Sequence, residues 1–312
     1  MEPIVNTGFD TTTSSDLLIA GRLRKIFDTT VHDVPEFHQD VCKVKTTKDM
    51  YTIDLRLAGL EDAAELGEGQ AIPLYTPTLG TEKKYTQRQF GIGFRMTDKM
   101  KKFNKYGLWE RWTKELARRQ KEARDAEIHV MFNNMTSTSL TAGVGFDTLA
   151  IANDTHTGLA TGTGDNYDNY LNAALSLAGL ESARYYFKTN IDDMGNLRIV
   201  TSPLTLVVEP TLYPDALEFT GSELKPGTFD NAINVIKKFG IKPKENPRLS
   251  STTCWFVIAK EDEGYDFQVL IAQQPDLKIN ECYDRTRDME ATSMQYFTYG
   301  WGDPRMLYAG KL

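Results

Sequence analysis

Two short segments of the sequence alternate strictly between apolar and polar residues. The first is YTIDLRL at residues 51–57, and the second is FGIGFRM at residues 90–96. Alternation predicts half-buried β-strands, because successive side chains of a strand point to opposite faces. Between them lies a polar stretch with many glycines, prolines and charges, GEGQAIPLYTPTLGTEKKYTQRQ. So long a connection is uncommon inside a compact domain and is often functional. We therefore expect a long hairpin over residues 51–97, with a tip that leaves the body of the protein.

The strongest helical pattern follows this hairpin, at residues 108–132. Trp109, Trp112, Leu116 and Met131 recur at helical spacing, and opposite charges lie four positions apart, as at Glu110 and Lys114. The spacing predicts one long amphipathic helix that packs against a sheet. Strands and helices beyond it mix without a regular βαβ rhythm, which favours an α+β fold.

Residues 203–217, PLTLVVEPTLYPDAL, predict a buried strand that runs into a helix with Pro210 or Pro214 in its first turn. This join holds no nucleophile, histidine or glycine-rich turn, so we interpret it as architecture. We also expect helices at residues 169–187 and 229–239, strands at 254–259 and 267–272, and a closing hairpin of residues 294–301 with 305–310. Residues 1–50 offer one short helical segment, DLLIAGRLRKIF, and predict an extension that cannot bury much by itself.

The sequence offers no residue on which to base a catalytic or cofactor-binding site. Its four histidines include His32 and His38, which with Asp33, Glu36 and Asp40 form the one cluster that resembles a metal site, but Pro35 interrupts any helix there. A solvated charged segment is the simpler interpretation, and a metal-dependent hydrolase is a remote alternative. Cys42, Cys254 and Cys282 lie far apart and predict free thiols. No phosphate-loop or nucleophile-elbow motif occurs. We therefore expect no catalytic residues, no metal and no cofactor.

Charge and hydropathy limit the partners. The formal net charge is −7, with acidic and basic residues mixed along the chain. Specific DNA-binding domains usually carry a basic patch, so we expect no sequence-specific binding to nucleic acid. No apolar segment approaches the length of a membrane span, and the N-terminus does not resemble a secretion signal.

The order of these segments resembles that of the major capsid proteins of tailed phages, which have the Hong Kong 97-like fold, and it is most similar to the Mu-like prophage major head subunits. The stretches YTQRQFGIGFRMTDKM, ESARYYFKTNIDDMGNLRIVTSPLTLVVEPTLYPDAL and YGWGDPRML carry the resemblance. It implies an N-terminal arm at residues 1–50, an extended E-loop hairpin at 51–97, and a peripheral domain with a long spine helix at 98–201. An axial domain at 202–300 and a returning C-terminal strand at 301–312 complete the order.

The resemblance implies a head protein that assembles into an icosahedral shell, as hexamers and pentamers, around the double-stranded DNA of a phage or prophage. It implies a separate scaffolding protein, a portal and decoration proteins as partners, synthesis in the host cytoplasm and a final location in the virion. An encapsulin-like nanocompartment shell is the alternative. Glu82, Lys83, Lys84 and Arg88 are the expected contact with a neighbouring subunit, at the hairpin tip. The covalent crosslink known in part of the family is not inferred, because no acceptor residue is recognisable.

Overall fold

The structure is a computed structural model that describes residues 11–57, 63–74, 79–103, 107–138, 146–157, 166–192, 195–198, 200–226, 232–260, 267–281 and 288–312. The chain forms two compact units, each built from three separated segments. The first comprises residues 1–36, 87–125 and 271–297, and the second comprises residues 37–86, 126–270 and 298–312. The units therefore do not follow the contiguous ranges expected from the sequence, and the assignment of those ranges as arm, loop and domains stays an expectation.

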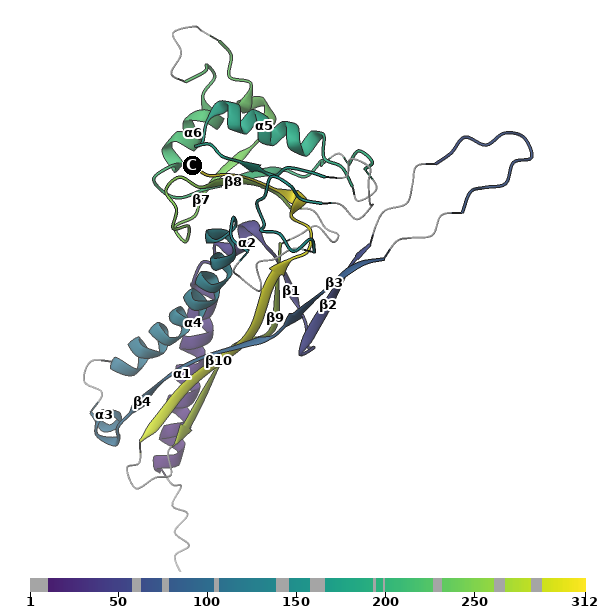
Figure 1. The fold of residues 1–312 in the computed structure, drawn as a ribbon. Helices are drawn as coiled ribbons and strands as arrows, with labels where there is room; N and C mark the ends of the chain where they lie inside the picture. Colours follow the sequence, from purple (N-terminus) through teal and green to yellow (C-terminus); the bar gives the residue numbers. More distant parts are fainter. Residues whose placement is uncertain are drawn as a thin grey trace, which may run out of the picture. The chain divides into compact units, whose positions relative to one another are not determined.

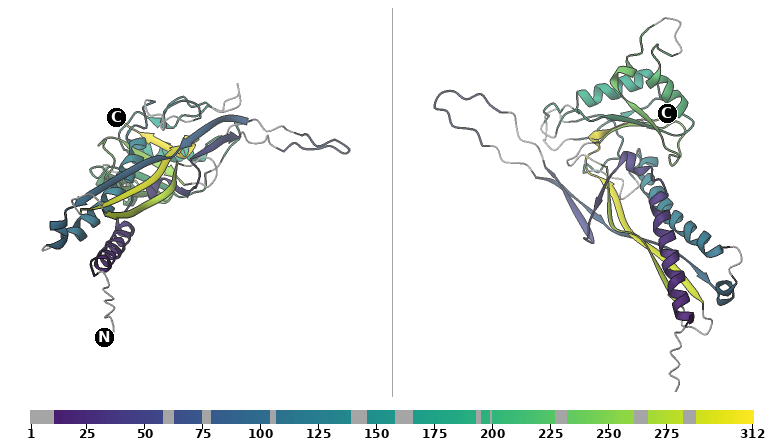
Figure 2. Two further views of the ribbon diagram at one scale, coloured as in Figure 1. Left: turned by 90° about the horizontal axis from the view of Figure 1, so that it is seen from below. Right: turned by 180° about the vertical axis from the view of Figure 1, so that it is seen from behind.

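The first unit is built from helices packed on long antiparallel strands. It contains α1 (Thr11–Asp33), β4 (Arg88–Met96), α3 (Asp98–Lys102) and most of α4 (Leu108–Asn133), with parts of β9 (Phe267–Glu281) and β10 (Met289–Trp301). β4 pairs antiparallel with β10 and is an edge strand of the sheet β1-β9-β10-β4. Figures 1 and 2 show α1 and α4 side by side on one face of these strands.

The core of the first unit explains why α1 is longer than expected. Leu23 and Phe27 of α1 are buried against Trp109 and Leu116 of α4, and Met96 of β4 joins them. The expected helix was too short, since α1 extends from Thr11 to Asp33, and Leu23 and Phe27, one turn apart, both contribute to the core. The predicted long helix is confirmed, and it ends at Asn133.

A buried ion-pair cluster anchors the end of this N-terminal segment. Glu36 accepts hydrogen bonds from Lys121 Nζ at 2.8 Å and from Arg124 Nε at 2.8 Å. The Arg124 side chain is only 1% exposed, and its Nη1 also donates to Gln274 of β9 at 2.9 Å. One carboxylate thus neutralises two cations inside the unit.

The second unit contains a five-stranded sheet in the order β5-β11-β8-β6-β7. Its strands are β5 (Tyr170–Leu171), β6 (Leu204–Val208), β7 (Lys242–Glu245), β8 (Trp255–Ala259) and β11 (Leu307–Gly310). Its helices α5 (Leu177–Lys188) and α6 (Tyr213–Gly221) lie on one face of the sheet (Figures 1 and 2). The unit also contains the short elements α2 (His38–Val41), η2 (Ile236–Phe239), η3 (Pro304–Met306) and β1 (Lys43–Thr46).

Both faces of this sheet are covered, so its central strands are apolar throughout. Leu206 and Trp255 belong to the core beneath α5 and α6. On the other face, the Phe256 ring stacks on Phe132 with ring centroids 5.2 Å apart. A strand covered on both sides loses the alternating pattern, which is why β8 is buried at every position.

The strand-to-helix join is confirmed. β6 has neighbours on both sides in the sheet, and Pro214 lies in the first turn of α6, where a missing N–H is tolerated. The predicted strands at 254–259 and 267–272 also form, although the second continues to Glu281.

Two other expectations were wrong. Residues 294–301 and 305–310 do not form a hairpin, since β10 pairs with β4 whereas β11 pairs with β8 and β5. Instead of a helix at 229–239, only Ile236–Phe239 form a 3₁₀ turn, η2, which follows an isolated bridge between Leu224 and Ile233, while residues 229–231 lie outside the described residues. The predicted helix at 169–187 begins only at Leu177, where the Ser176 hydroxyl accepts a hydrogen bond from the Gly179 N–H.

Candidate assembly surface

The predicted hairpin forms, but its second strand is not the one that the sequence analysis predicted. β2 (Tyr51–Leu57) pairs antiparallel with β3 (Leu79–Thr86) and not with residues 90–96, which form β4. The register sets Ile53 opposite Lys84 and Asp54 opposite Lys83. Because paired residues share a face, the hairpin has one face with Ile53 and Lys84 and another with Asp54 and Lys83.

The polar face of this hairpin points toward its own unit. Arg56 is 8% exposed and lies 3.5 Å from Asp303, while Lys83 Nζ donates to the carbonyl oxygen of Trp301 at 2.8 Å. The Trp301 ring lies beneath the same ammonium group, 4.5 Å from its centroid. Burial lowers the pKa of Lys83 to about 8, and the nearby Asp147 and Asp54 oppose this effect.

A buried polar cluster continues behind Arg56. Asp303 also binds Arg305, with Nη1 to Oδ2 at 2.8 Å, and accepts from the Tyr167 hydroxyl at 3.0 Å. Burial would raise the pKa of Asp147, but its hydrogen bond with His156 and the charges of His156 and Arg56 bring that pKa below its usual value. These contacts hold Arg56, and with it the base of the hairpin, against the rest of the unit.

The apolar face of the hairpin points outward. Tyr51, Ile53 and Leu55 are 48%, 49% and 41% exposed, although the alternation predicted that this side would be buried. The Lys84 ammonium lies 4.2 Å from the centroid of the Tyr51 ring. We call Tyr51, Ile53, Leu55, Glu82 and Lys84 the outer face. Farther along, every residue from 63 to 74 is exposed, and Leu74 reaches 93%.

The four predicted contact residues do not lie together. Glu82 and Lys84 are exposed on the outer face, Lys83 points to the opposite side and binds its own chain, and Arg88 lies in β4 with its guanidinium 5.2 Å from the Phe90 ring centroid. The expectation that they form the hairpin tip was wrong, since all four lie within β3 or β4. Their contact with a neighbouring subunit stays a prediction.

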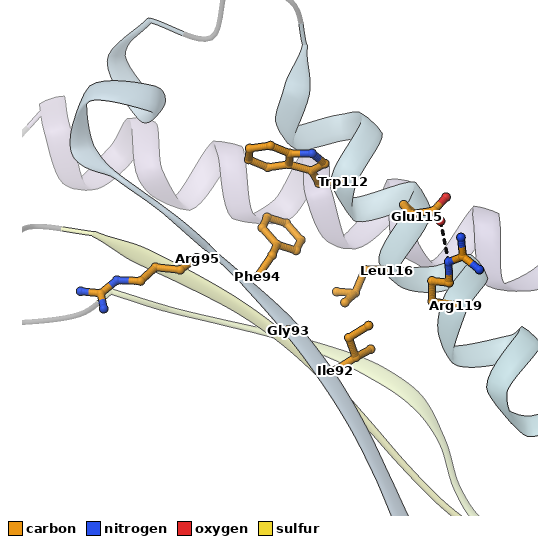
Figure 3. Close-up of a pocket in the computed structure, with 8 residues that line it drawn as sticks. All are labelled: Ile92, Gly93, Phe94, Arg95, Trp112, Glu115, Leu116 and Arg119. Carbon is orange, nitrogen blue, oxygen red and sulfur yellow. Dashed lines mark hydrogen bonds and ion pairs between the residues drawn. The ribbon is translucent and has the colours of Figure 1, made fainter.

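A surface groove of about 290 Å³ lies between β4 and α4 in the first unit. Figure 3 shows Ile92 and Phe94 of β4 directed toward Trp112 and Leu116 of α4, with the Glu115–Arg119 ion pair beside them. The Phe94 and Trp112 rings meet edge to face, with centroids 5.8 Å apart. The sequence analysis missed this groove, although Ile92 and Trp112 both belong to apolar faces that it identified.

The residues of the remote hydrolase alternative do not assemble into a centre. His32 is exposed and His38 is buried. Among the described residues, no three His, Cys, Asp or Glu side chains are grouped as metal ligands would be. Within the same ranges, no helix is both long and apolar enough to cross a bilayer.

Comparisons with known proteins bear directly on this architecture. The sequence matches the family model described as phage capsid protein over residues 80–310. No curated protein matches the sequence.

Solved structures share the fold at low sequence identity. The capsid structure of the cyanophage P-SCSP1u matches with a TM-score of 0.59 and 11% identity, covering 89% of this chain and 88% of that one. The mature capsid of bacteriophage PhiM1 gives 0.53 and 11%, covering 89% and 87%. A virus-like particle from Pyrococcus furiosus gives 0.55 and 9%, covering 93% and 98%.

The family match covers most of the chain, and these structures place its mixed helix-and-sheet architecture among phage capsid folds. The family match supports a phage shell over the alternative of a nanocompartment shell. The chain belongs to the phage capsid protein family, with the Hong Kong 97-like fold, and is a major capsid protein that assembles with copies of itself into the shell of a tailed-phage head.

Proposed function

We propose that the outer face of the β2–β3 hairpin is a contact between copies in this shell, and that it binds the groove between β4 and α4 of a second copy. The observation that carries this proposal is the exposed row Tyr51, Ile53 and Leu55. Three large apolar side chains at strand spacing leave a continuous apolar surface in water, which is a common mark of an interaction site.

The groove has the matching chemistry. Its floor is apolar, at Ile92, Phe94 and Leu116, and its rim carries both signs of charge at Glu115 and Arg119. Glu82 and Lys84 flank the apolar row of the hairpin. An apolar centre with charged groups around it is the usual anatomy of a specific protein interface, where the charges set register more than affinity.

The test is a pair of substitutions, one on each surface. Ile53→Asp on the hairpin and Ile92→Asp in the groove should each reduce the yield of shells by more than about tenfold, because each contact would lose about 1.5–3 kcal/mol of apolar burial. Electron microscopy and sedimentation velocity measure the yield, and circular dichroism checks the fold.

Leu197→Asp is the matched control, since Leu197 is also exposed but lies outside both surfaces. It should assemble as the unchanged chain does. Normal shells from the Ile53→Asp chain would remove the hairpin from the interface.

The remaining partners follow from the family and are part of the same proposal. The chain acts without catalysis, is made in the host cytoplasm, and assembles with a separate scaffolding protein, a portal and decoration proteins. It encloses DNA through weak contacts to phosphate, in keeping with its net charge of −7. Purification of shells with their bound proteins, followed by mass spectrometry, tests the partner set.

A further inference from the structure

Four buried polar side chains lie between α4 and β10 in the first unit. We call them the polar seam, which consists of Thr113 and Gln120 on the helix and Ser293 and Gln295 on the strand. None of the four is more than 1% exposed. The same two elements contribute Leu116, Ala117 and Ala291 to the apolar core of this unit. Polar groups in such surroundings cost free energy unless they are hydrogen-bonded.

The two glutamines of the seam join the helix to the strand through reciprocal hydrogen bonds. Gln120 Nε2 donates to the main-chain carbonyl oxygen of Ser293 at 2.7 Å, and Gln295 Nε2 donates to the main-chain carbonyl oxygen of Gln120 at 2.7 Å. Gln295 Nε2 also donates to Gln120 Oε1 at 2.9 Å. Each backbone is thus bound by a side chain of the other element. Because hydrogen bonds depend steeply on distance and angle, this set forms at one position of α4 along β10.

The hydroxyl groups of the seam take no part in these contacts. Among the described residues, the Thr113 and Ser293 hydroxyls have no hydrogen-bond partner, although both are buried. The two carboxamides are therefore the side-chain groups that make directional contacts across the seam. Removal of either hydroxyl would leave these contacts in place.

The seam lies beside the groove between β4 and α4. Ser293 is directly opposite Ile92 in the pairing of β10 with β4, and Arg119, which lines the groove, immediately precedes Gln120. One wall of the groove comes from β4 and the other from α4 (Figure 3). A displacement of α4 along β10 by one helical turn, about 5.4 Å, would therefore move one wall past the other.

We propose that Gln120 and Gln295 are positioning residues, which fix the register of α4 on β10 and thereby the shape of the groove that receives a second copy. Apolar contacts have no preferred direction, so the core around the seam does not select one register by itself. In a displaced helix both carboxamides would be buried without their hydrogen bonds, at a cost in free energy. A single buried polar residue selects the alignment of coiled coils in the same way. The inference rests on the proposed function only for what the groove binds, because the register is a property of one chain.

Replacement of both glutamines by methionine tests this role. Gln120→Met with Gln295→Met keeps the approximate volume of the side chains, and the urea midpoint should not fall, because loss of both partners of a buried hydrogen bond can be neutral or stabilising. The fraction of protein in shells should nevertheless fall about fivefold or more, since only copies in the native register present a fitting groove. Arg124 of α4, which binds β9, is unchanged, so the variant tests the carboxamides alone.

Pulsed electron paramagnetic resonance measures the register in free subunits. Spin labels at Arg118→Cys on α4 and Glu290→Cys on β10 replace side chains that are 62% and 42% exposed. Both labelled chains, with and without the methionines, have their three native cysteines replaced by alanine. The chain with both glutamines should give one distance, and the chain with both methionines should give a second population.

Thr113→Val and Ser293→Ala are the matched controls, because each makes the seam less polar but keeps both carboxamides and the main-chain carbonyl of Ser293. Both should keep one distance and assemble normally. One native distance in the chain with both methionines would overturn the inference. A lower urea midpoint than in either single glutamine variant would also overturn it, since the carboxamides would then serve stability. A second distance with normal shells would keep the positioning role and remove the groove from the interface.

Discussion

Lys83 and Lys84 are neighbours in β3, yet their side chains leave the strand on opposite faces. Lys84 is exposed beside Tyr51, and Lys83 is bound to the carbonyl oxygen of Trp301. Both are lysines, and we assigned both from the sequence to one contact between subunits. Lys83 is opposite Asp54 in the hairpin and binds Trp301, which is distant in the sequence. These two contacts place its side chain on the inner face.

The buried position of Lys83 predicts a pH dependence of stability. Burial lowers its pKa from 10.5 to about 8 in the folded protein, so the unfolded chain holds the proton more tightly. The cost of burying the charge is therefore fully present below about pH 8, and it declines until about pH 10.5. Relative to Lys83→Met, the unchanged chain should gain up to about 3 kcal/mol in unfolding free energy between pH 7 and pH 10.5. Urea titrations of both chains measure the difference, and a difference that stays constant with pH would contradict it.

At the scale of single elements, the success of the sequence analysis depended on where the determining contacts lie. The pattern of α4 is local, because helical spacing, charge pairs and apolar face all lie within residues 108–133, and the helix was predicted almost to its ends. The alternation of β2 predicted a strand correctly but the wrong buried side. Arg56 turns inward because Asp303 lies there, and no local pattern records that partner. Distant partners also explain why β10 and β11 do not form the predicted hairpin, since β10 pairs with β4 and β11 pairs with β8.

A buried acidic residue lies three positions beyond the end of helix α1. Glu36 is the carboxylate shared by Lys121 and Arg124, and its side chain is only 2% exposed. Glu36→Gln keeps the shape but leaves two buried cations without their counter-charge, so the unfolding free energy should fall by about 3–5 kcal/mol. Glu115→Gln removes one carboxylate from an exposed ion pair of α4, the helix that also carries Lys121 and Arg124, and should cost less than about 1 kcal/mol. Equal losses in the two variants, measured by urea denaturation, would show that the cluster contributes no more than a surface pair.

At the scale of the whole molecule, the distribution of charge determines how strongly the shell protein binds DNA. The chain has 43 acidic and 36 basic residues, and many of its cations are already paired within the protein, as Arg124 is with Glu36 and Arg305 with Asp303. The remaining cations are mixed with an excess of acidic residues, and contacts to phosphate carry no sequence information. Binding to duplex DNA should therefore be weak and equal for different sequences.

The measurement uses two DNA duplexes of equal length and unrelated sequence. Fluorescence anisotropy measures the affinity of each duplex for free subunits or for assembled shells opened at a vertex. Their dissociation constants should agree within about twofold, and the affinity should fall by about an order of magnitude or more between about 50 and 200 mM salt, because binding rests on release of counterions. Lys84→Glu removes an exposed cation and should weaken the binding of both duplexes by the same factor. A preference for one sequence that persists at the higher salt would require contacts to base edges, and it would contradict a shell that encloses DNA without reading it.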